Sequence, residues 1–290
     1  MPAAALRALL TQAIDYAGLF PPASLALEPA LENQAEYVRS DEHWMLGAFI
    51  LPLGKFAAAS AQLARFDAQH PWQISALGPK GVTADDFAKT LRRAAAAIEE
   101  FSATHRDVIA VTQFEMPLPV GAAPQSLGAL RVFWETPADT ASATIEALAG
   151  SGAGFKLRTG GVTADAFPSD EQIARALVAA ARHRVPIKFT AGLHHPVKKF
   201  HESVGTKMHG FLNVLGAGVL VAEHGWDEAQ TAAMLAEEDG RSFAFDDESF
   251  RWRDWEITTL QIETRRQLVT SLGSCSFDEP REDLRALGLW

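Results

Sequence analysis

Apolar and polar positions follow two alternating patterns along this chain. Short runs rich in β-branched and aromatic residues predict buried strands, and longer stretches with apolar residues at helical spacing predict helices between them. The predicted strands are residues 14–19, 45–51, 72–77, 108–114, 130–134, 154–157 and 186–190, with a weaker one at 243–246. The predicted helices include 85–104, 170–183 and 257–272, and an N-terminal helix comes before the first strand.

Helix-start signals support this assignment of elements. Thr83 stands three residues before Asp86, and Ser169 stands three residues before Gln172, which is the spacing of a capping box. The second of these helices runs into Pro186, where a proline ends a helix and the next strand begins.

Alternating strands and helices predict parallel strands joined by helical crossovers. Eight strands close a barrel, so we predict an α/β fold, a (β/α)8 TIM barrel formed as a single domain over residues 1–290. The main alternative is a doubly wound sheet, in which a glycine-rich turn usually follows the first strand. Neither GxGxxG nor GxxxxGK[ST] occurs, so the sequence does not favour dinucleotide or P-loop binding, and we expect no cofactor.

Composition narrows the classes of protein. Hydrophobic residues make up 48% of the 290 residues, which is typical of a folded globular chain. The single cysteine excludes an internal disulfide and favours a reducing, cytoplasmic location. A net charge of −10 without a dense basic run argues against nucleic-acid binding. The longest apolar run, 211–222, is too short to span a bilayer, so we expect no membrane partner. A homo-oligomer is compatible with the sequence.

Two lysines lie inside otherwise apolar strands, in GFKLR and PIKFT. Side chains alternate along a strand, so Lys156 shares a face with Arg158, and Lys188 shares a face with Thr190. If both faces point into the barrel, repulsion and desolvation would depress the pKa of at least one lysine and make it a nucleophile. The structural alternative is that each lysine pairs with Glu135 or Glu115.

The segment 154–195 resembles class I aldolases of the deoxyribose-phosphate aldolase type. GFKLRTGG is similar to that family's K-T-S-T-G strand end at Lys156, Thr159 and Gly160, and PIKFTAGLHH is similar to its V-K-A-[SA]-G-G-I-R strand end at Lys188 and Gly192. The resemblance implies a β/α barrel. It also implies that Lys156 is the Schiff-base lysine and that Lys188 lowers its pKa.

Other strand-end groups complete the predicted site. Glu135, and after it Glu115, are the expected general acid or base. We expect Arg158, Thr159, Gly160, Gly161, Thr190 and Asp246 to bind substrate. Arg158 suits a carboxylate, whereas Asp246 at the last predicted strand end would repel a phosphate.

Histidine, cysteine and aspartate residues supply further reactive groups. His194 follows the strand at 186–190, and we assign it a proton-shuttle or substrate-contact role. A divalent metal held by histidines with Asp246 or Glu223 is the alternative, but HxH and HExxH are absent and we predict no metal. Cys275 is interpreted as a buried thiol. Asp15 lies near the first strand, beside a segment that could face a substrate.

Three classes of function remain open. The first is an aldolase-like lyase that acts on a small, anionic carbonyl compound, a sugar or keto acid, through a Schiff base on Lys156. The second is a non-covalent acid–base isomerase or lyase on the same barrel, with Lys188 and His194 active and a metal as an option. The third is a non-catalytic barrel that binds a small molecule. A lysine adduct, activity restored by metal, or binding without turnover would separate them.

Overall fold

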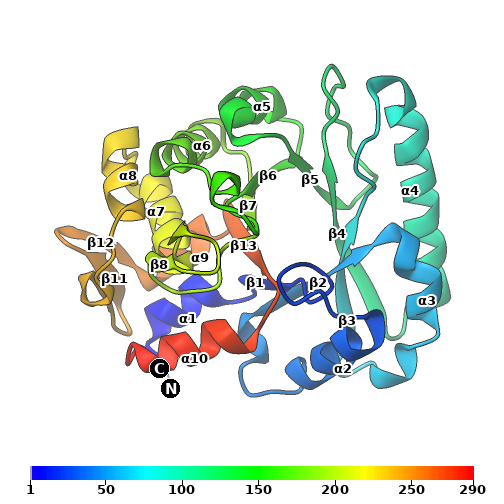
Figure 1. The fold of residues 1–290 in the computed structure, drawn as a ribbon, viewed down its shortest axis with the longest axis horizontal. Coiled ribbons are helices and arrows are strands. Elements are labelled where there is room, and N and C mark those ends of the chain that lie inside the picture. Colours follow the sequence, from blue (N-terminus) through cyan, green and yellow to red (C-terminus); the bar gives the residue numbers. More distant parts are fainter. Residues whose placement is uncertain (1) are drawn as a thin grey trace.

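Eight parallel strands close into a barrel in the computed structural model, which describes residues 2–290 (Figure 1). In spatial order they run β1, β13, β7, β6, β5, β4, β3 and β2, and β2 pairs with β1 to close the ring. Their bounds are Ile14–Tyr16 (β1), Leu46–Pro52 (β2), Trp72–Leu77 (β3), Ile109–Pro117 (β4), Arg131–Glu135 (β5), Gly154–Arg158 (β6), Ile187–Thr190 (β7) and Val269–Ser274 (β13). The predicted (β/α)8 barrel is therefore confirmed.

Helices surround the barrel (Figure 1). They are α1 (Ala4–Leu10), α2 (Leu27–Tyr37), α3 (Phe56–Ser60), α4 (Ala84–Thr104), α5 (Ala141–Leu148), α6 (Asp170–His183), α7 (Phe211–His224), α8 (Glu228–Leu235), α9 (Thr259–Arg265) and α10 (Asp278–Ala286). The Thr83 cap on α4 and the Ser169 capping box on α6 both form as predicted. Within residues 2–290 no helix has the length and apolarity needed to cross a membrane.

The crossover between β7 and β13 holds most of the additional structure. It contains the two-stranded sheet of β8 (Lys199–His201) and β9 (Thr206–Met208), and the three-stranded sheet of β10 (Phe243–Phe245), β11 (Ser249–Trp252) and β12 (Trp255–Thr258). The strand predicted at 243–246 is real, but its assignment to the barrel is wrong. Phe245 of this strand stacks on Phe250 of the neighbouring antiparallel strand. The aromatic residues that suggested a barrel strand therefore pack within this small sheet.

The eighth barrel strand begins inside the segment predicted as a helix over 257–272. That segment instead contains the end of β12, α9, and the first four residues of β13. The sequence of β13, VTSLGS, is rich in small and hydroxyl residues, because Ser271 faces the polar interior of the barrel and hydrogen-bonds Asp15 there. Beyond Val269 and Thr270 it has no β-branched or aromatic residue, so it carries little of the signal on which the prediction depended.

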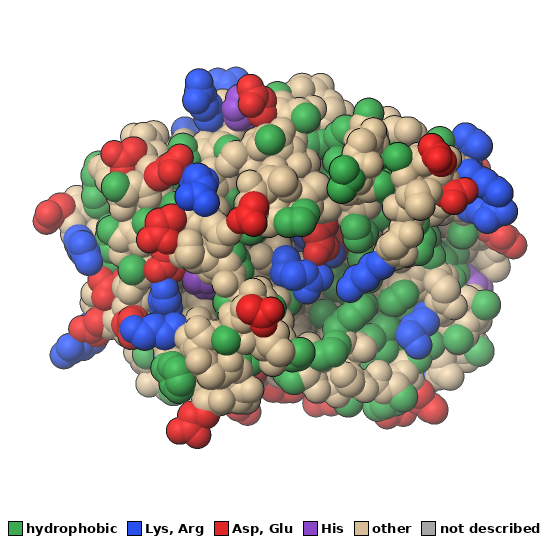
Figure 2. All heavy atoms as spheres, turned by 45° about the horizontal axis from the view of Figure 1, so that its top comes forward, with side chains coloured by type: hydrophobic (Ala, Val, Ile, Leu, Met, Phe, Trp, Pro, Cys, Tyr) green, Lys and Arg blue, Asp and Glu red, His purple; other side chains and the backbone are tan. Residues whose placement is uncertain are grey.

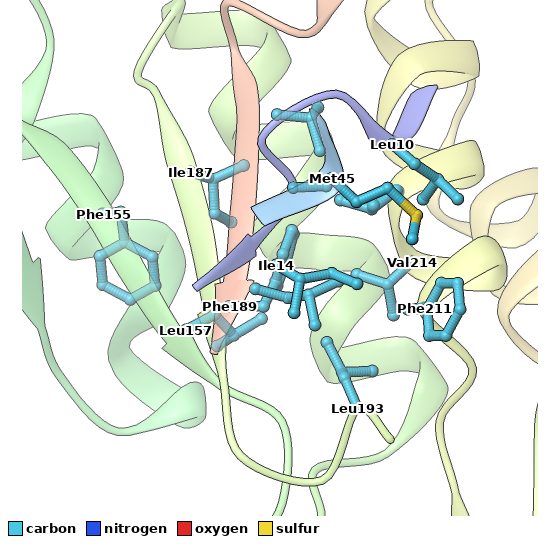
Figure 3. Close-up of a cluster of buried hydrophobic side chains, with 14 of the residues drawn as sticks. Leu10, Ile14, Met45, Phe155, Leu157, Ile187, Phe189, Leu193, Phe211 and Val214 are labelled. Atoms are coloured by element: carbon cyan, nitrogen blue, oxygen red, sulfur yellow. The ribbon is translucent and has the colours of Figure 1, made fainter. Parts of the chain in front are cut away.

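Strand alternation separates an apolar exterior from a charged interior. Phe155 pairs in register with Ile187, and Leu157 with Phe189, and these side chains join the core beneath the helices (Figure 3). Lys156 pairs in register with Lys188 between them. Because successive side chains point to opposite faces, both lysines enter the barrel, as predicted.

Two glycines make room for the interior side chains. A Cβ on Gly47 would lie 2.3 Å from Oδ1 of Asp15, and a Cβ on Gly154 would lie 2.5 Å from Cε1 of Phe133. Phe133 fills the centre of the barrel, with the Lys188 ammonium 5.3 Å from its ring centroid. The buried lysine therefore faces an aromatic ring as well as its ion-pair partners.

Gly154→Ala should destabilise the barrel. The new methyl group would contact the Phe133 ring and come 2.8 Å from the carbonyl oxygen of Pro186, which is backbone and cannot move aside freely. We expect the free energy of unfolding in urea to fall by about 1–3 kcal/mol. The matched control is Gly54→Ala, whose Cβ meets nothing within 4 Å and should change stability by less than about 0.5 kcal/mol. Equal effects of the two substitutions would contradict this packing.

Candidate active site

Six side chains form a chain of ion pairs with alternating charge through the barrel. Arg158 Nε lies 3.0 Å from one oxygen of Glu135, and the other oxygen of Glu135 lies 3.0 Å from Lys156 Nζ. Lys156 Nζ also lies 2.9 Å from Oε2 of Glu115. The chain continues from Oε1 of Glu115 to Lys188, whose Nζ lies 2.8 Å from Oδ2 of Asp15. Three positive and three negative groups therefore balance within the barrel.

The inner members of this ion-pair chain are almost fully buried. The side chains of Lys156 and Lys188 are 4% and 1% exposed, and that of Glu115 is 2% exposed. Only Arg158, at 41%, reaches solvent to a large extent. Buried charges persist only when they are paired and hydrogen-bonded, and removing one partner leaves another charge stranded.

Pairing outweighs burial in setting the charge of these groups. Burial by itself disfavours the ionised form of Glu115, but the positive charges of Lys156 and Lys188 hold the pKa of this carboxyl well below its usual range. Glu135 behaves in the same way, because Lys156 and Arg158 lower its pKa against the effect of burial. Both carboxyls are therefore ionised at neutral pH.

Repulsion between the two lysines does not depress the pKa of Lys188. Burial favours the neutral amine of Lys188, but the carboxylates of Asp15 and Glu115 raise its pKa above the ordinary value. Glu115 stands between the two lysines and contacts both, so attraction to a shared carboxylate replaces the expected repulsion. The structural pairing of the lysines with Glu115 and Glu135, the alternative in the sequence analysis, is what the structure contains.

The outer end of the ion-pair chain opens into a cavity at the carboxyl ends of the strands. This cavity of about 460 Å³ is lined by Glu135 and Arg158 and by residues of the loops that follow β4, β5 and β6, among them Asp139 and Phe167. Arg158 uses Nε to bind Glu135, and among residues 2–290 its two Nη groups have no hydrogen-bond partner. A guanidinium with free amino groups in a cavity is suited to bind a carboxylate.

Charged groups of both signs also lie beside a hollow on the face shown in Figure 2. The carboxyl ends of the strands are where β/α barrels carry their active sites. The cavity and the Glu135–Lys156 contact therefore define the candidate active site.

A second cluster lies at the carboxyl ends of β7 and β13. His194 Nδ1 is 3.0 Å from Oε2 of Glu279 and 3.9 Å from Sγ of Cys275. Burial lowers the pKa of His194, but its hydrogen bonds to Cys275 and Glu279 raise it to about 9. His194 is therefore a cation at neutral pH. Cys275 is buried, as predicted. It lies 81 positions from His194 in the chain, so the contact between them forms only in the folded protein.

Three of the predicted substrate-binding residues make structural contacts in the loops after β6 and β7. Thr159 donates its hydroxyl to the carbonyl oxygen of Ala191 at 2.7 Å. Gly160 packs against Gly192, with only 2.8 Å between the position of a Cβ and the Gly192 Cα. A Cβ on Gly161 would lie 2.7 Å from the Cβ of Ala166. These contacts fix the loops after β6 and β7.

Two further residues of the predicted site lie apart from the cavity. Thr190 pairs in register with Arg158 but does not line the cavity. Asp246 follows β10, outside the barrel, and pairs with Arg251 at 2.7 Å, so its predicted place at a barrel strand end is wrong. The cause is the misassigned eighth strand.

Asp15 is the site residue that sequence reasoning undervalued. It is 1% exposed and accepts hydrogen bonds from Ala48 N and Ser271 Oγ, both at 2.7 Å, in addition to its pairing with Lys188. An aspartate inside the apolar strand IDY is the same signal that identified the lysines. A pairing over 173 positions could not be read from the sequence.

Among residues 2–290, no three or more His, Cys, Asp and Glu side chains are arranged to hold a metal ion. No protein-family model matches this chain, and no curated protein is significantly similar to it in sequence. The candidate site is therefore interpreted from its own geometry.

Glu115→Gln should destabilise the fold strongly. It removes the charge that both lysines share and leaves two buried ammonium groups with reduced compensation, so we expect the free energy of unfolding to fall by about 3–5 kcal/mol. Glu238→Gln breaks the half-exposed pair with Lys207 and should cost less than about 1 kcal/mol. Urea denaturation of both variants measures the difference. A loss for Glu115→Gln as small as that of the control would refute the buried pairing.

Stability should fall in acid, with a sign set by the carboxyl groups. The pKa values of Glu115 and Glu135 are lowered in the folded state from an ordinary value of 4.5. Their contribution is complete above about pH 4.5 and is lost as the pH falls through the folded-state pKa values. Urea unfolding between pH 6 and pH 3 should show this decline, and the decline should be shallower in Glu115→Gln. A parallel decline in both proteins would exclude Glu115 as a source.

Proposed function

We propose that this protein is an aldolase-like lyase that acts on a small, anionic carbonyl compound through a Schiff base on Lys156. One observation carries the proposal: the Lys156 amino group lies 3.0 Å from the carboxylate of Glu135, and Glu135 lines the cavity at the carboxyl end of the barrel. The amine is thus separated from the cavity by one group that can accept its proton.

The cavity supports a substrate with a single carboxylate. The free Nη groups of Arg158 can bind such a group with two hydrogen bonds. Asp139 and Asp165 also line the cavity, and their negative charges disfavour a phosphate dianion. A keto acid or an acid sugar fits these constraints better than a phosphorylated sugar.

Schiff-base formation on Lys156 can proceed without an external acid or base. Glu135 takes a proton from the Lys156 ammonium, and the resulting amine adds to the substrate carbonyl carbon to give a carbinolamine. Glu135 then returns its proton to the carbinolamine hydroxyl, which leaves as water, and the nitrogen lone pair forms the iminium bond. The net change consumes one carbonyl compound and releases one water.

The remaining charged groups hold this pair in place. Glu115 also binds the Lys156 amine, and Lys188 in turn binds Glu115. In this proposal Lys188 acts as a positioning residue that keeps Glu115 ionised. His194 lies with Cys275 and Glu279 and does not line the cavity, so the proposal gives it no part in the chemical step.

One observation favours a second candidate function. Both lysines are ion-paired, and an ammonium held between carboxylates is a proton donor before it is a nucleophile. Lys156 as the acid and Glu135 as the base would then catalyse a non-covalent isomerisation or elimination on the same anionic substrate. The two candidates share the cavity and Arg158 but differ in whether an adduct forms.

Borohydride trapping separates them. The protein is incubated with keto acids, aldoses and hexuronic acids in the presence of borohydride, and adducts are mapped by peptide mass spectrometry. We expect reduction to fix a substrate on Lys156, with the adduct absent in Lys156→Met and formed roughly 10²–10⁴-fold more slowly in Glu135→Gln. Lys207→Met, which removes a half-exposed lysine, is the matched control and should trap normally.

Turnover of a substrate without any adduct would reject the Schiff base and favour the acid–base reaction. Adducts spread over exposed lysines, with Lys156 unmodified, would also reject the proposal.

A further inference from the structure

A second cavity lies at the opposite end of the barrel. It has a volume of about 790 Å³ and is lined by the first residues of the strands, such as Gly47 of β2, Gln73 of β3 and Arg131 of β5. Residues of α1 and α9 complete its wall. A neighbouring cavity of about 700 Å³ shares Thr11, Gln12, Gly47 and Gln73 with it. Together they form a groove across the amino-terminal face.

The lining of this amino-terminal groove is polar and nearly balanced in charge. The first cavity is lined by four side-chain amides, four side-chain hydroxyls, two acids and two arginines. A side-chain amide both donates and accepts hydrogen bonds, and so does a hydroxyl. Such a lining matches a ligand whose groups also do both.

Charged and apolar ligands fit the groove less well. Arg266 is already engaged by backbone carbonyl oxygens, among them that of Thr11 at 2.9 Å, so it is not free for an anion. Asp15 is paired with Lys188. Among residues 2–290, Arg131 and Glu263 of the lining have no ion-pair partner, so one free charge of each sign remains and the two offset each other. Few apolar side chains line the cavity, and its volume is in the range of small-molecule sites.

Buried polar atoms without partners lie along the same groove. The Oε1 atom of Gln34, a residue 1% exposed that lines the second cavity, has no hydrogen-bond partner among residues 2–290. The Nε atom of Arg266, in the first cavity, has none either. Buried polar groups are normally hydrogen-bonded, so these two atoms mark incompletely paired polar packing along the groove.

We propose that the amino-terminal groove binds a neutral, polyhydroxylated ligand of the size of a mono- or disaccharide. This site is separate from the cavity at the carboxyl end, and it does not depend on the proposed lyase activity. Hydroxyl groups of the ligand would pair with the amides of Gln12, Gln73 and Gln113.

The groove also reaches the ion-pair chain. Gln113 and Ser271 line the cavity, and both hydrogen-bond Oδ2 of Asp15, at 3.5 Å and 2.7 Å. The same oxygen pairs with Lys188. A ligand that takes a hydrogen bond from Gln113 or Ser271 therefore changes the environment of a carboxylate that the buried lysine shares.

Calorimetry with a defined panel tests the site. The probes are glucose, galactose, xylose, maltose and sorbitol, with glucose 6-phosphate and glucuronate as charged counterparts. We expect at least one neutral probe to bind with a millimolar or lower Kd and more tightly than its charged counterpart. Gln73→Leu and Gln12→Leu keep the side-chain size but remove the amide, and each should weaken binding roughly tenfold.

Arg158→Ala is the control that distinguishes this groove from the candidate active site. It alters the opposite cavity, so it should leave binding of the neutral probe unchanged. Saturation with the bound probe should also move the NMR signal of ¹⁵N-labelled Lys188. Absence of neutral-probe binding up to about 10 mM, preference for the charged probes, or loss of binding in Arg158→Ala would each overturn the site. Binding with an unmoved Lys188 signal would overturn its connection to the ion pairs.

Discussion

The carboxylate of Glu115 binds two lysine ammonium groups inside a closed barrel, and the interior is organised around this contact. Each ammonium needs a negative neighbour because water cannot reach it, and Glu115 supplies one oxygen to each. Asp15 and Glu135 then balance the outer sides of Lys188 and Lys156. The glycine at position 47 serves this charge balance, because a side chain there would displace Asp15.

This arrangement gives the two ends of the barrel different chemistry. At the carboxyl end the ion-pair chain reaches a cavity through Glu135 and Arg158, where a proton acceptor and a free guanidinium stand beside a buried amine. At the amino end it stops at Asp15, which lines the polar groove and accepts hydrogen bonds from Ser271 and Gln113. The proposed proton-transfer pair therefore lies at one end, and side-chain amides and hydroxyls make up most of the polar lining at the other.

Strand alternation made the positions of the two buried lysines predictable. It placed Lys156 and Lys188 side by side in the barrel, and the strand at 72–77 and the helix at 170–183 coincide with β3 and α6. The partners of the lysines were available only as alternatives, because a local pattern carries no information about which distant carboxylate fills the space between two strands. Asp15 and the Cys275–His194 contact depend on closure of the ring between β13 and β1. The polar sequence of β13 hid that closure.

The ionisation of Glu115 is the most direct test of the central claim. In protein carrying ¹³C-labelled glutamate, with the signal assigned by its loss in Glu115→Gln, the side-chain carboxyl resonance can be followed as the pH is lowered from 7. Because two ammonium groups hold its pKa far below the ordinary 4.5, we predict that the resonance stays at the ionised position through pH 4.5 and down to the onset of acid unfolding. Protonation of Glu115 at or above pH 4.5 in the folded protein would contradict the shared-carboxylate arrangement.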